Sequence, residues 1–353
     1  MKNRRLPHIL LALSWLTIVS CAEETTAPNT AAPSAGPDFA LASNTWLTRR
    51  DMPLELIEQV AAVVPNAAGQ SILYAIGGGL ADSPKPGALI PLGEVRAYNV
   101  ATNTWTSKRD MPAARWGMNG AGVIGGKIYV TGGYTKAGEY WGSTASLFVY
   151  NPASDTWTRK RDMPAGGGNG VTGVIRGQLY VITLNYSVNQ VVRFFRYDPT
   201  KDSWTTLPSP ADYPKYYVGG GVINNKLYLM GASDGFKEYR VLEYNPNTNQ
   251  WTKRQSWSSQ SCVPNFECSI GGPAVVMLAH LYVFGSYSTG FSGGPGIFIY
   301  DPASDSWESK PLITTFGYWD DSRLTAARVF VNGQPRVEVI GGYRPGNNLQ
   351  YIP

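Results

Sequence analysis

Short apolar stretches with a central tyrosine recur along the chain, each bounded by glycine or by polar turn residues. Tyrosine flanked by aliphatic residues, several of them β-branched, is the composition typical of β-strands. The stretches are Leu73–Ile76, Ile128–Val130, Leu179–Ile182, Leu227–Met230 and Leu281–Phe284. This recurrence predicts an all-β chain built from repeated units.

A second pattern follows each of these stretches, a tyrosine and a tryptophan separated by seven positions. Between the two aromatic residues lies Asn or Asp, followed in all but one case by Pro, which suits a type I turn. Each unit therefore predicts a strand, a turn and another strand. The pairs are Tyr98/Trp105, Tyr150/Trp157, Tyr197/Trp204, Tyr244/Trp251 and Tyr300/Trp307.

Each unit also contains an earlier apolar stretch, such as Gly122–Ile124 or Gly173–Ile175, so that a complete repeat has four strands. Three residues after the central tyrosine comes glycine in every repeat except the third, which has Thr183. Glycine at a strand end fits a close approach of neighbouring backbones or a positive φ.

The combination of a glycine doublet, a tyrosine and a tryptophan at these offsets resembles the kelch repeat of β-propellers. Doublets stand at Gly77-Gly78, Gly132-Gly133 and Gly341-Gly342, whereas repeats three to five depart from the doublet and keep the spacing. The resemblance covers residues 40 to 353. It implies a six-bladed kelch-type β-propeller in which each blade is one four-stranded sheet.

The two ends of this region predict how the ring closes. Val337–Gly342 repeats the second strand, with Glu338 at the tyrosine position, and Tyr351–Pro353 repeats the third. The fourth, tryptophan-bearing strand is found near the other end of the chain, because Asn44–Pro53 mirrors Asn103–Pro112. We therefore expect the N-terminal strand to complete the last blade, which removes the exposed sheet edges.

The first twenty residues have the features of a secretory signal, a basic flank and an apolar run from Leu6 to Val19. The run is too short for a membrane span, because Glu23 and Glu24 follow closely. The residues Ile18-Val19-Ser20-Cys21 resemble a bacterial lipobox. This resemblance implies cleavage before Cys21 and acylation of its thiol; the alternative is an ordinary signal peptide that leaves the thiol free.

Residues 21–38 are mainly small and polar and contain no aromatic or branched aliphatic residue, so they predict a disordered tether. The predicted organisation is a signal peptide (1–20), a lipidated tether (21–38) and one propeller domain (39–353). The expected location is the surface of a bacterial membrane, in the periplasm or outside the cell. The lipid anchor is the one expected contact with the membrane.

Charge gives no indication of a nucleic-acid partner. The formal net charge is +5, and loss of Lys2, Arg4 and Arg5 with the signal leaves 27 basic and 25 acidic residues, a net charge of +2. No basic run or clustered basic face is visible. We expect a monomer that binds a protein or glycan ligand.

The three cysteines predict a lipid site and a disulfide. With Cys21 assigned to lipid, Cys262 and Cys268 remain, and two nearby cysteines outside the cytosol usually pair. A two-cysteine metal site and free thiols are the alternatives.

Motifs for catalysis are missing. His280 is the one histidine outside the predicted signal, and its place before Leu281 suggests a structural role at the start of a strand. Kelch-fold oxidases resembling galactose oxidase and the plant specifier proteins need histidine ligands that this chain lacks. No phosphate loop or Ser/Cys-His arrangement appears. We therefore expect no catalytic residues, metal or cofactor.

The loops that enter each blade carry the candidate ligand-binding residues. The kelch resemblance implies that these loops gather at one mouth of the central channel, where aromatic faces stack on a ligand and charges orient it. The candidates are Arg115, Trp116, Asn169, Lys215, Tyr216, Tyr217, Trp319, Asp320, Asp321 and Arg323. A second aromatic group, Tyr134, Lys136, Tyr140 and Trp141, is expected on a loop at the same face. The alternative is that many of these side chains cap the seams between blades.

These observations favour a non-catalytic binding scaffold for a protein or glycan. The alternative is a sugar enzyme, because periplasmic kelch propellers include a sialic acid mutarotase, N-acetylneuraminate epimerase. That reaction needs a carboxylate acid/base beside an arginine. Asp320 or Asp321 with Arg115 or Arg323 meets this need only if the side chains converge.

Overall fold

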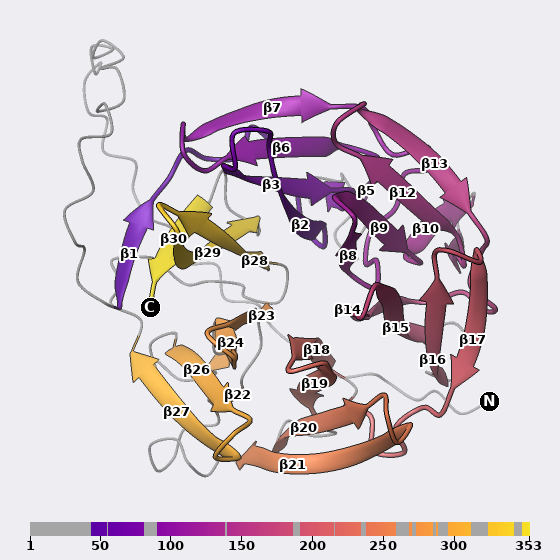
Figure 1. Cartoon of the computed structure of the whole chain (residues 1–353), viewed down its shortest axis with the longest axis vertical. Helices are drawn as coiled ribbons and strands as arrows, with labels where there is room; N and C mark the ends of the chain where they lie inside the picture. Colours follow the sequence, from indigo (N-terminus) through magenta and orange to yellow (C-terminus); the bar gives the residue numbers. More distant parts are fainter. Residues whose placement is uncertain are drawn as a thin grey trace, which may run out of the picture. The chain divides into compact units, whose positions relative to one another are not determined.

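The computed structural model of the chain has six four-stranded antiparallel sheets arranged in a ring (Figure 1). It describes residues 44–54, 56–80, 90–137, 140–185, 191–214, 216–233, 238–258, 268–269, 273–284, 287–288, 296–311, 324–341 and 348–353. All of these residues belong to one compact unit, Leu41–Pro353. Within them there is no helix long and apolar enough to cross a membrane. The predicted six-bladed β-propeller is confirmed.

Each sheet is one blade, and its four strands lie in order from the centre of the ring to the perimeter. The first three blades, from inner to outer strand, are β2 (Val60–Pro65), β3 (Ser71–Ile76), β6 (Val95–Asn99) and β7 (Thr104–Lys108); β8 (Ala121–Ile124), β9 (Lys127–Thr131), β12 (Leu147–Asn151) and β13 (Thr156–Lys160); and β14 (Gly168–Ile175), β15 (Gln178–Asn185), β16 (Val191–Asp198) and β17 (Ser203–Leu207).

The remaining blades follow the same order. They are β18 (Tyr216–Ile223), β19 (Lys226–Ala232), β20 (Glu238–Asn245) and β21 (Gln250–Ser258); β23 (Ala274–Met277), β24 (His280–Phe284), β26 (Gly296–Asp301) and β27 (Ser306–Pro311); and β28 (Leu324–Val331), β29 (Gln334–Gly341), β30 (Asn348–Ile352) and β1 (Thr45–Thr48). Three short two-stranded pairings are added, β4 (Gly79–Leu80) with β5 (Ile90–Pro91), β10 (Tyr134–Ala137) with β11 (Tyr140–Ser143), and β22 (Cys268–Ser269) with β25 (Tyr287–Ser288).

The N-terminal strand closes the ring as the sequence predicted. Strand β1 pairs antiparallel with β30, and Trp46 lies opposite Tyr351, the same register that joins Tyr98 to Trp105 in blade 1. The sixth blade therefore combines the two ends of the folded region, which lie side by side in Figure 1.

The hydrophobic core of the described residues is divided into six clusters, each between two neighbouring blades. Small residues on the inner strands make this packing possible. A β-carbon at Gly173 would lie 2.6 Å from Val222 Cγ2 of the next blade, and one at Gly221 would lie 2.5 Å from Val276 Cγ2. Glycine on one blade thus receives a valine of the next, and the blades approach closely around the axis.

The Tyr/Trp repeat has its physical basis in contacts between blades. In blade 2, Asp155 Oδ1 accepts a hydrogen bond from Tyr150 OH (2.6 Å) and one from the backbone N–H of Arg109 in blade 1 (2.9 Å). Trp157 Nε1 donates to the carbonyl of the same Arg109 (2.9 Å). Asp155 has φ 51°, a left-handed conformation that Asp and Asn tolerate better than most residues.

We call this set of contacts the outer-strand latch. The tryptophan bond recurs from Trp105 to Arg50, Trp204 to Arg161, Trp251 to Pro208 and Trp307 to Gln255, at 2.8 to 2.9 Å. The left-handed residue recurs as Asn44, Asn103, Asp202, Asn249 and Asp305. The sequence analysis missed this residue, because it concentrated on the turn at the other end of the Tyr/Trp interval.

A second set of tyrosines, those of the second strands, also joins neighbouring blades. Each packs against the third-strand tyrosine of the next blade, with ring centroids 5.7 to 6.4 Å apart. At the seam between blades 6 and 1 this place belongs to Glu338, which is fully buried and accepts a hydrogen bond from Gln350 Nε2. Burial raises the pKa of Glu338 to about 7, although Gln350, Arg49 and Arg336 act in the opposite direction.

The latch predicts a contrast between two substitutions of one residue. Asp155→Ala removes the acceptor for Tyr150 and Arg109 and places alanine at a positive φ, so we expect the free energy of unfolding to fall by about 2–4 kcal/mol. Asp155→Asn keeps an acceptor at a position where blades 1, 4 and 6 already have Asn, and should remain within about 1 kcal/mol of the unmodified protein. Urea denaturation measures both; equal losses would contradict the latch.

The buried carboxyl predicts a pH dependence of stability. Its pKa is 4.5 in the unfolded reference and about 7 in the folded protein, so the folded state binds the proton more tightly. The contribution is fully present below about pH 4.5 and is lost as the pH rises through about 7, by up to roughly 3 kcal/mol.

Glu338→Gln keeps the shape of the side chain and cannot ionise. Relative to this variant, the unmodified protein should lose stability between pH 5 and pH 8 in urea denaturation. Identical pH profiles for the two proteins would show that Glu338 does not titrate in this range.

Candidate functional site

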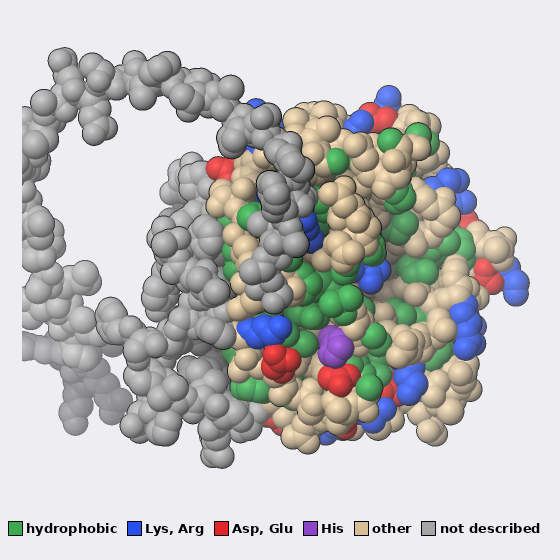
Figure 2. All heavy atoms as spheres, turned by 60° about the vertical axis from the view of Figure 1, so that its left-hand side comes forward, with side chains coloured by type: hydrophobic (Ala, Val, Ile, Leu, Met, Phe, Trp, Pro, Cys, Tyr) green, Lys and Arg blue, Asp and Glu red, His purple; other side chains and the backbone are tan. Residues whose placement is uncertain are grey.

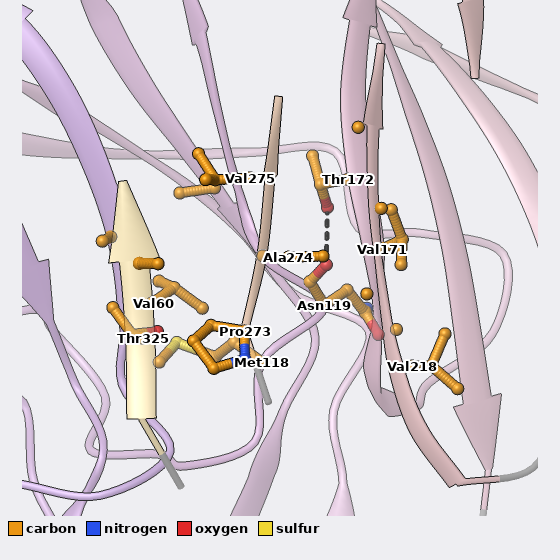
Figure 3. Close-up of a pocket in the computed structure, with 18 of the residues that line it drawn as sticks. Val60, Met118, Asn119, Val171, Thr172, Val218, Pro273, Ala274, Val275 and Thr325 are labelled. Carbon is orange, nitrogen blue, oxygen red and sulfur yellow. Dashed lines mark hydrogen bonds between the residues drawn. The ribbon is translucent and has the colours of Figure 1, made fainter. Parts of the chain in front are cut away.

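A central cavity of about 620 Å³ lies on the axis of the ring. Its wall comes from the innermost strand of every blade, β2, β8, β14, β18, β23 and β28, and from the residues that precede these strands. Figure 3 shows aliphatic side chains such as Val60, Val171, Val218 and Val275 around the cavity, together with the polar residues Asn119, Thr172 and Thr325. Volumes of about 300–1,000 Å³ are usual for small-molecule sites.

Three residues with a left-handed backbone line one mouth of this cavity. Glu58 (φ 57°) and Gly117 (φ 57°) come from the entry loops of blades 1 and 2, and Asn169 (φ 49°) is the second residue of strand β14. Gly117 N–H donates to the Glu58 carbonyl (3.2 Å), and Asn169 N–H donates to the Gly117 carbonyl (2.7 Å). We call this hydrogen-bonded chain the collar.

An aromatic pair stands beside the collar. Trp116 and Tyr134 exchange two backbone hydrogen bonds, of 3.2 and 2.8 Å, and their rings lie 5.0 Å apart at 33°. Tyr134 is buried and donates its hydroxyl to the Leu184 carbonyl of blade 3, whereas Trp116 is half-buried. The entry loop of blade 2 is thus fastened to the loop between its second and third strands, as expected for two groups on one face.

Polar side chains in the wall are mainly amides and hydroxyls. Thr172 Oγ1 donates to the Asn119 carbonyl (2.9 Å; dashed in Figure 3), and Thr325 Oγ1 donates to the Gln59 carbonyl (2.9 Å). The side-chain amides of Asn119 and Gln59 are 0% and 3% exposed and have no hydrogen-bond partner among the described residues. Buried amides without partners are unusual and point to a bound water or ligand.

The structure places Arg115 away from the cavity. It is 1% exposed, donates to the Gly132 carbonyl (3.0 Å) and lies 4.9 Å from the ring centroid of Phe148. Burial lowers the pKa of this guanidinium to about 10. Arg115 therefore holds the seam beside the glycine doublet, which is the structural role that the sequence analysis had left as the alternative.

Of the other predicted residues, Asn169 lines the mouth, and Trp116, which is paired with Tyr134, precedes the Gly117 to which Asn169 is hydrogen-bonded. Tyr216 and Tyr217 begin strand β18, and Lys136, Tyr140 and Trp141 belong to the β10–β11 hairpin; the described structure covers only their backbones. Lys215, Trp319, Asp320, Asp321 and Arg323 lie outside the described residues, as do Cys21 and Cys262. Cys268 pairs with Ser288 through its backbone, and the disulfide stays a prediction.

Two functional candidates were missed by the sequence analysis, Glu58 and Asn119. Neither is aromatic, and neither belongs to the Tyr/Trp pattern on which the analysis concentrated. The signal that could have revealed them is position, because both precede the innermost strand of their blade by one or two residues.

His280 begins strand β24 as predicted and is not among the residues that line the cavity. Its Nδ1 lies 2.6 Å from the Leu278 carbonyl, and its Nε2 lies 3.7 Å from Asp301 Oδ1. Among the described residues, no three His, Cys, Asp or Glu side chains gather as a metal site. On the face that Figure 2 shows, Lys and Arg side chains are scattered among Asp and Glu side chains and form no continuous basic stripe.

Comparison with known proteins supports the repeat assignment. The Kelch motif family model matches residues 115–164. The chain is 37% identical over 171 residues to Kelch-like protein terF of Aspergillus terreus, a match that covers 44% of this chain and 37% of that protein. It is 27% identical over 274 residues to human Kelch-like protein 23, covering 75% of this chain and 44% of that protein.

The chain thus spans less than half the length of these two relatives. Among solved structures, the structure of YjhT aligns with a TM-score of 0.58 at 16% identity, covering 85% of this chain and 94% of that one. At this identity the likeness shows the fold.

The burial of Arg115 predicts a stability effect. Arg115→Ala leaves the Gly132 carbonyl without a donor and removes the packing on Phe148, so we expect a loss of about 2–4 kcal/mol in the free energy of unfolding. Arg159→Ala, which removes an exposed arginine of the same blade, should change stability by less than about 0.5 kcal/mol. Thermal or urea denaturation separates the two, and an Arg115 variant as stable as the Arg159 variant would contradict the structural role.

Proposed function

Because the chain is a kelch-repeat β-propeller, we propose that it is an exported, lipid-anchored binding protein that recognises a protein or glycan ligand at the collar face. The collar face comprises Glu58, Trp116, Gly117, Tyr134 and Asn169. A kelch propeller is suited to serve as a binding scaffold. Location, anchor and ligand class are part of the proposal.

The observation that carries this proposal is the composition of the cavity mouth. Glu58 and Asn169 line it on a backbone held by hydrogen bonds between blades, and the half-buried Trp116 precedes the collar residue Gly117. A rigid surface that presents aromatic and polar groups loses little conformational entropy when a ligand binds.

Epimerisation of an acid sugar requires an arginine near a carboxylate. Of the residues considered for this role, Arg115 is buried in the seam, and Asp320, Asp321 and Arg323 lie outside the described residues. Within the described part of the wall, Glu58 is the one charged side chain. Anomer exchange of N-acetylneuraminate followed by NMR tests the enzymatic alternative, and a rate equal to that in buffer rejects it.

The anchor follows from the residues Ile18 to Cys21. Expression of the full chain in a bacterial host should give a product that begins with an acylated Cys21, and Cys21→Ser should abolish the acylation. Mass spectrometry of the N-terminal peptide measures both, and an unmodified N-terminal cysteine would exclude the lipid anchor.

The binding face is tested by a pair of variants, one at the collar face and one at the opposite end of the propeller. Trp116→Ala should lower the binding of envelope proteins or arrayed glycans at least tenfold, because it removes the aromatic surface. Arg176→Ala changes the turn at the far end of β14 from the collar, and should bind as the unmodified protein does. Circular dichroism verifies that both variants fold; equal binding by both would place the site elsewhere.

A further inference from the structure

Glu58 has a backbone conformation that disfavours its side chain. The collar needs a left-handed residue here, because the Glu58 carbonyl accepts the N–H of Gly117. The other two collar positions have Gly and Asn, the residue types that adopt this conformation most readily. A glutamate at such a position is unusual, and unfavourable backbone conformations of this kind concentrate at functional sites.

The strained residue lies where a ligand would enter. Glu58 is half-buried and is one of the residues that line the cavity, and its Oε2 oxygen is buried. On the other side of Gly117, the Asn169 amide occupies the space that a side chain at position 117 would take, because a β-carbon there would lie 2.6 Å from Asn169 Oδ1. The glycine therefore leaves room for two polar side chains at the mouth.

Deeper in the cavity the hydroxyls of Thr172 and Thr325 each donate to a neighbouring blade and retain lone pairs as acceptors. The buried amide of Asn119 has no partner among the described residues and lies in the same wall. Aliphatic side chains such as Val60, Val171 and Val275 lie among these groups in Figure 3.

We propose that the collar face binds a neutral carbohydrate, with Glu58 and Asn169 as its hydrogen-bonding contacts and Trp116 as its stacking surface. Sugars present hydroxyls, which suit carboxylate, amide and hydroxyl groups, and apolar C–H faces, which suit aliphatic and aromatic walls. The Glu58 carboxylate repels an acidic sugar. This inference rests on the proposed function, because it assigns a ligand class to the same face.

Two substitutions of Glu58 separate strain from binding. Glu58→Asn introduces the residue that blade 3 has, so it should raise the melting temperature of the full chain by about 1–3 °C. Glu58→Gln keeps the strain and removes the charge, so its melting temperature should be unchanged. A marked loss of stability in Glu58→Gln would show that the carboxylate supports the fold, and would overturn the proposal.

The binding test is an array of neutral and acidic glycans probed with the full chain. We expect signals on neutral glycans, reduced at least tenfold in Glu58→Gln, Glu58→Asn and Asn169→Gly, the last of which retains the left-handed backbone. Preference for acidic glycans, or signals that the variants leave unchanged, would overturn the proposal. An array without any signal, combined with a protein ligand that depends on Trp116, would reject the carbohydrate and leave the proposed binding function intact.

Discussion

The outer-strand latch is the interaction on which the rest of the structure depends. One Asp or Asn oxygen accepts from the tyrosine of its own blade and, in blades 1, 2, 3 and 5, from the backbone of the preceding blade. The tryptophan of each of these blades donates a hydrogen bond from its indole N–H to the carbonyl of the same residue of the preceding blade. Because each blade is hydrogen-bonded to the blade before it, the ring of latches is complete only when blade 1 also has a blade before it. Residues 44–50 supply this contact, since the Arg50 carbonyl accepts a hydrogen bond from Trp105 Nε1.

The seam between blades 6 and 1 is chemically different from the other seams. Five seams have a pair of tyrosines, whereas the sixth has Glu338 buried among Gln350, Arg336 and the closing residue Arg49. A buried acid is costly when it ionises without full compensation. The seam between blades 6 and 1 is therefore the seam whose stability depends most directly on pH.

The repeat made most of the fold predictable, because strand number and ring closure follow from aromatic residues at fixed offsets. Residues outside that pattern were harder to assign. Arg115 was expected in the channel, but Gly132 and Phe148 offer it a buried acceptor and a stacking surface. Glu58 was missed because its role depends on a backbone conformation that periodicity does not reveal. A left-handed residue is recognisable in sequence when it is Gly or Asn, and hidden when it is Glu.

Structural and functional residues occupy different radii of the ring. The latches join outer strands along the perimeter, whereas the collar lies at the start of the innermost strands around the axis (Figure 1). Inner strands must also keep small residues where the blades converge, such as Gly173 and Gly221. This separation explains how a ring with uniform joints can carry unlike side chains, Glu58, Gly117 and Asn169, at equivalent places on its binding face.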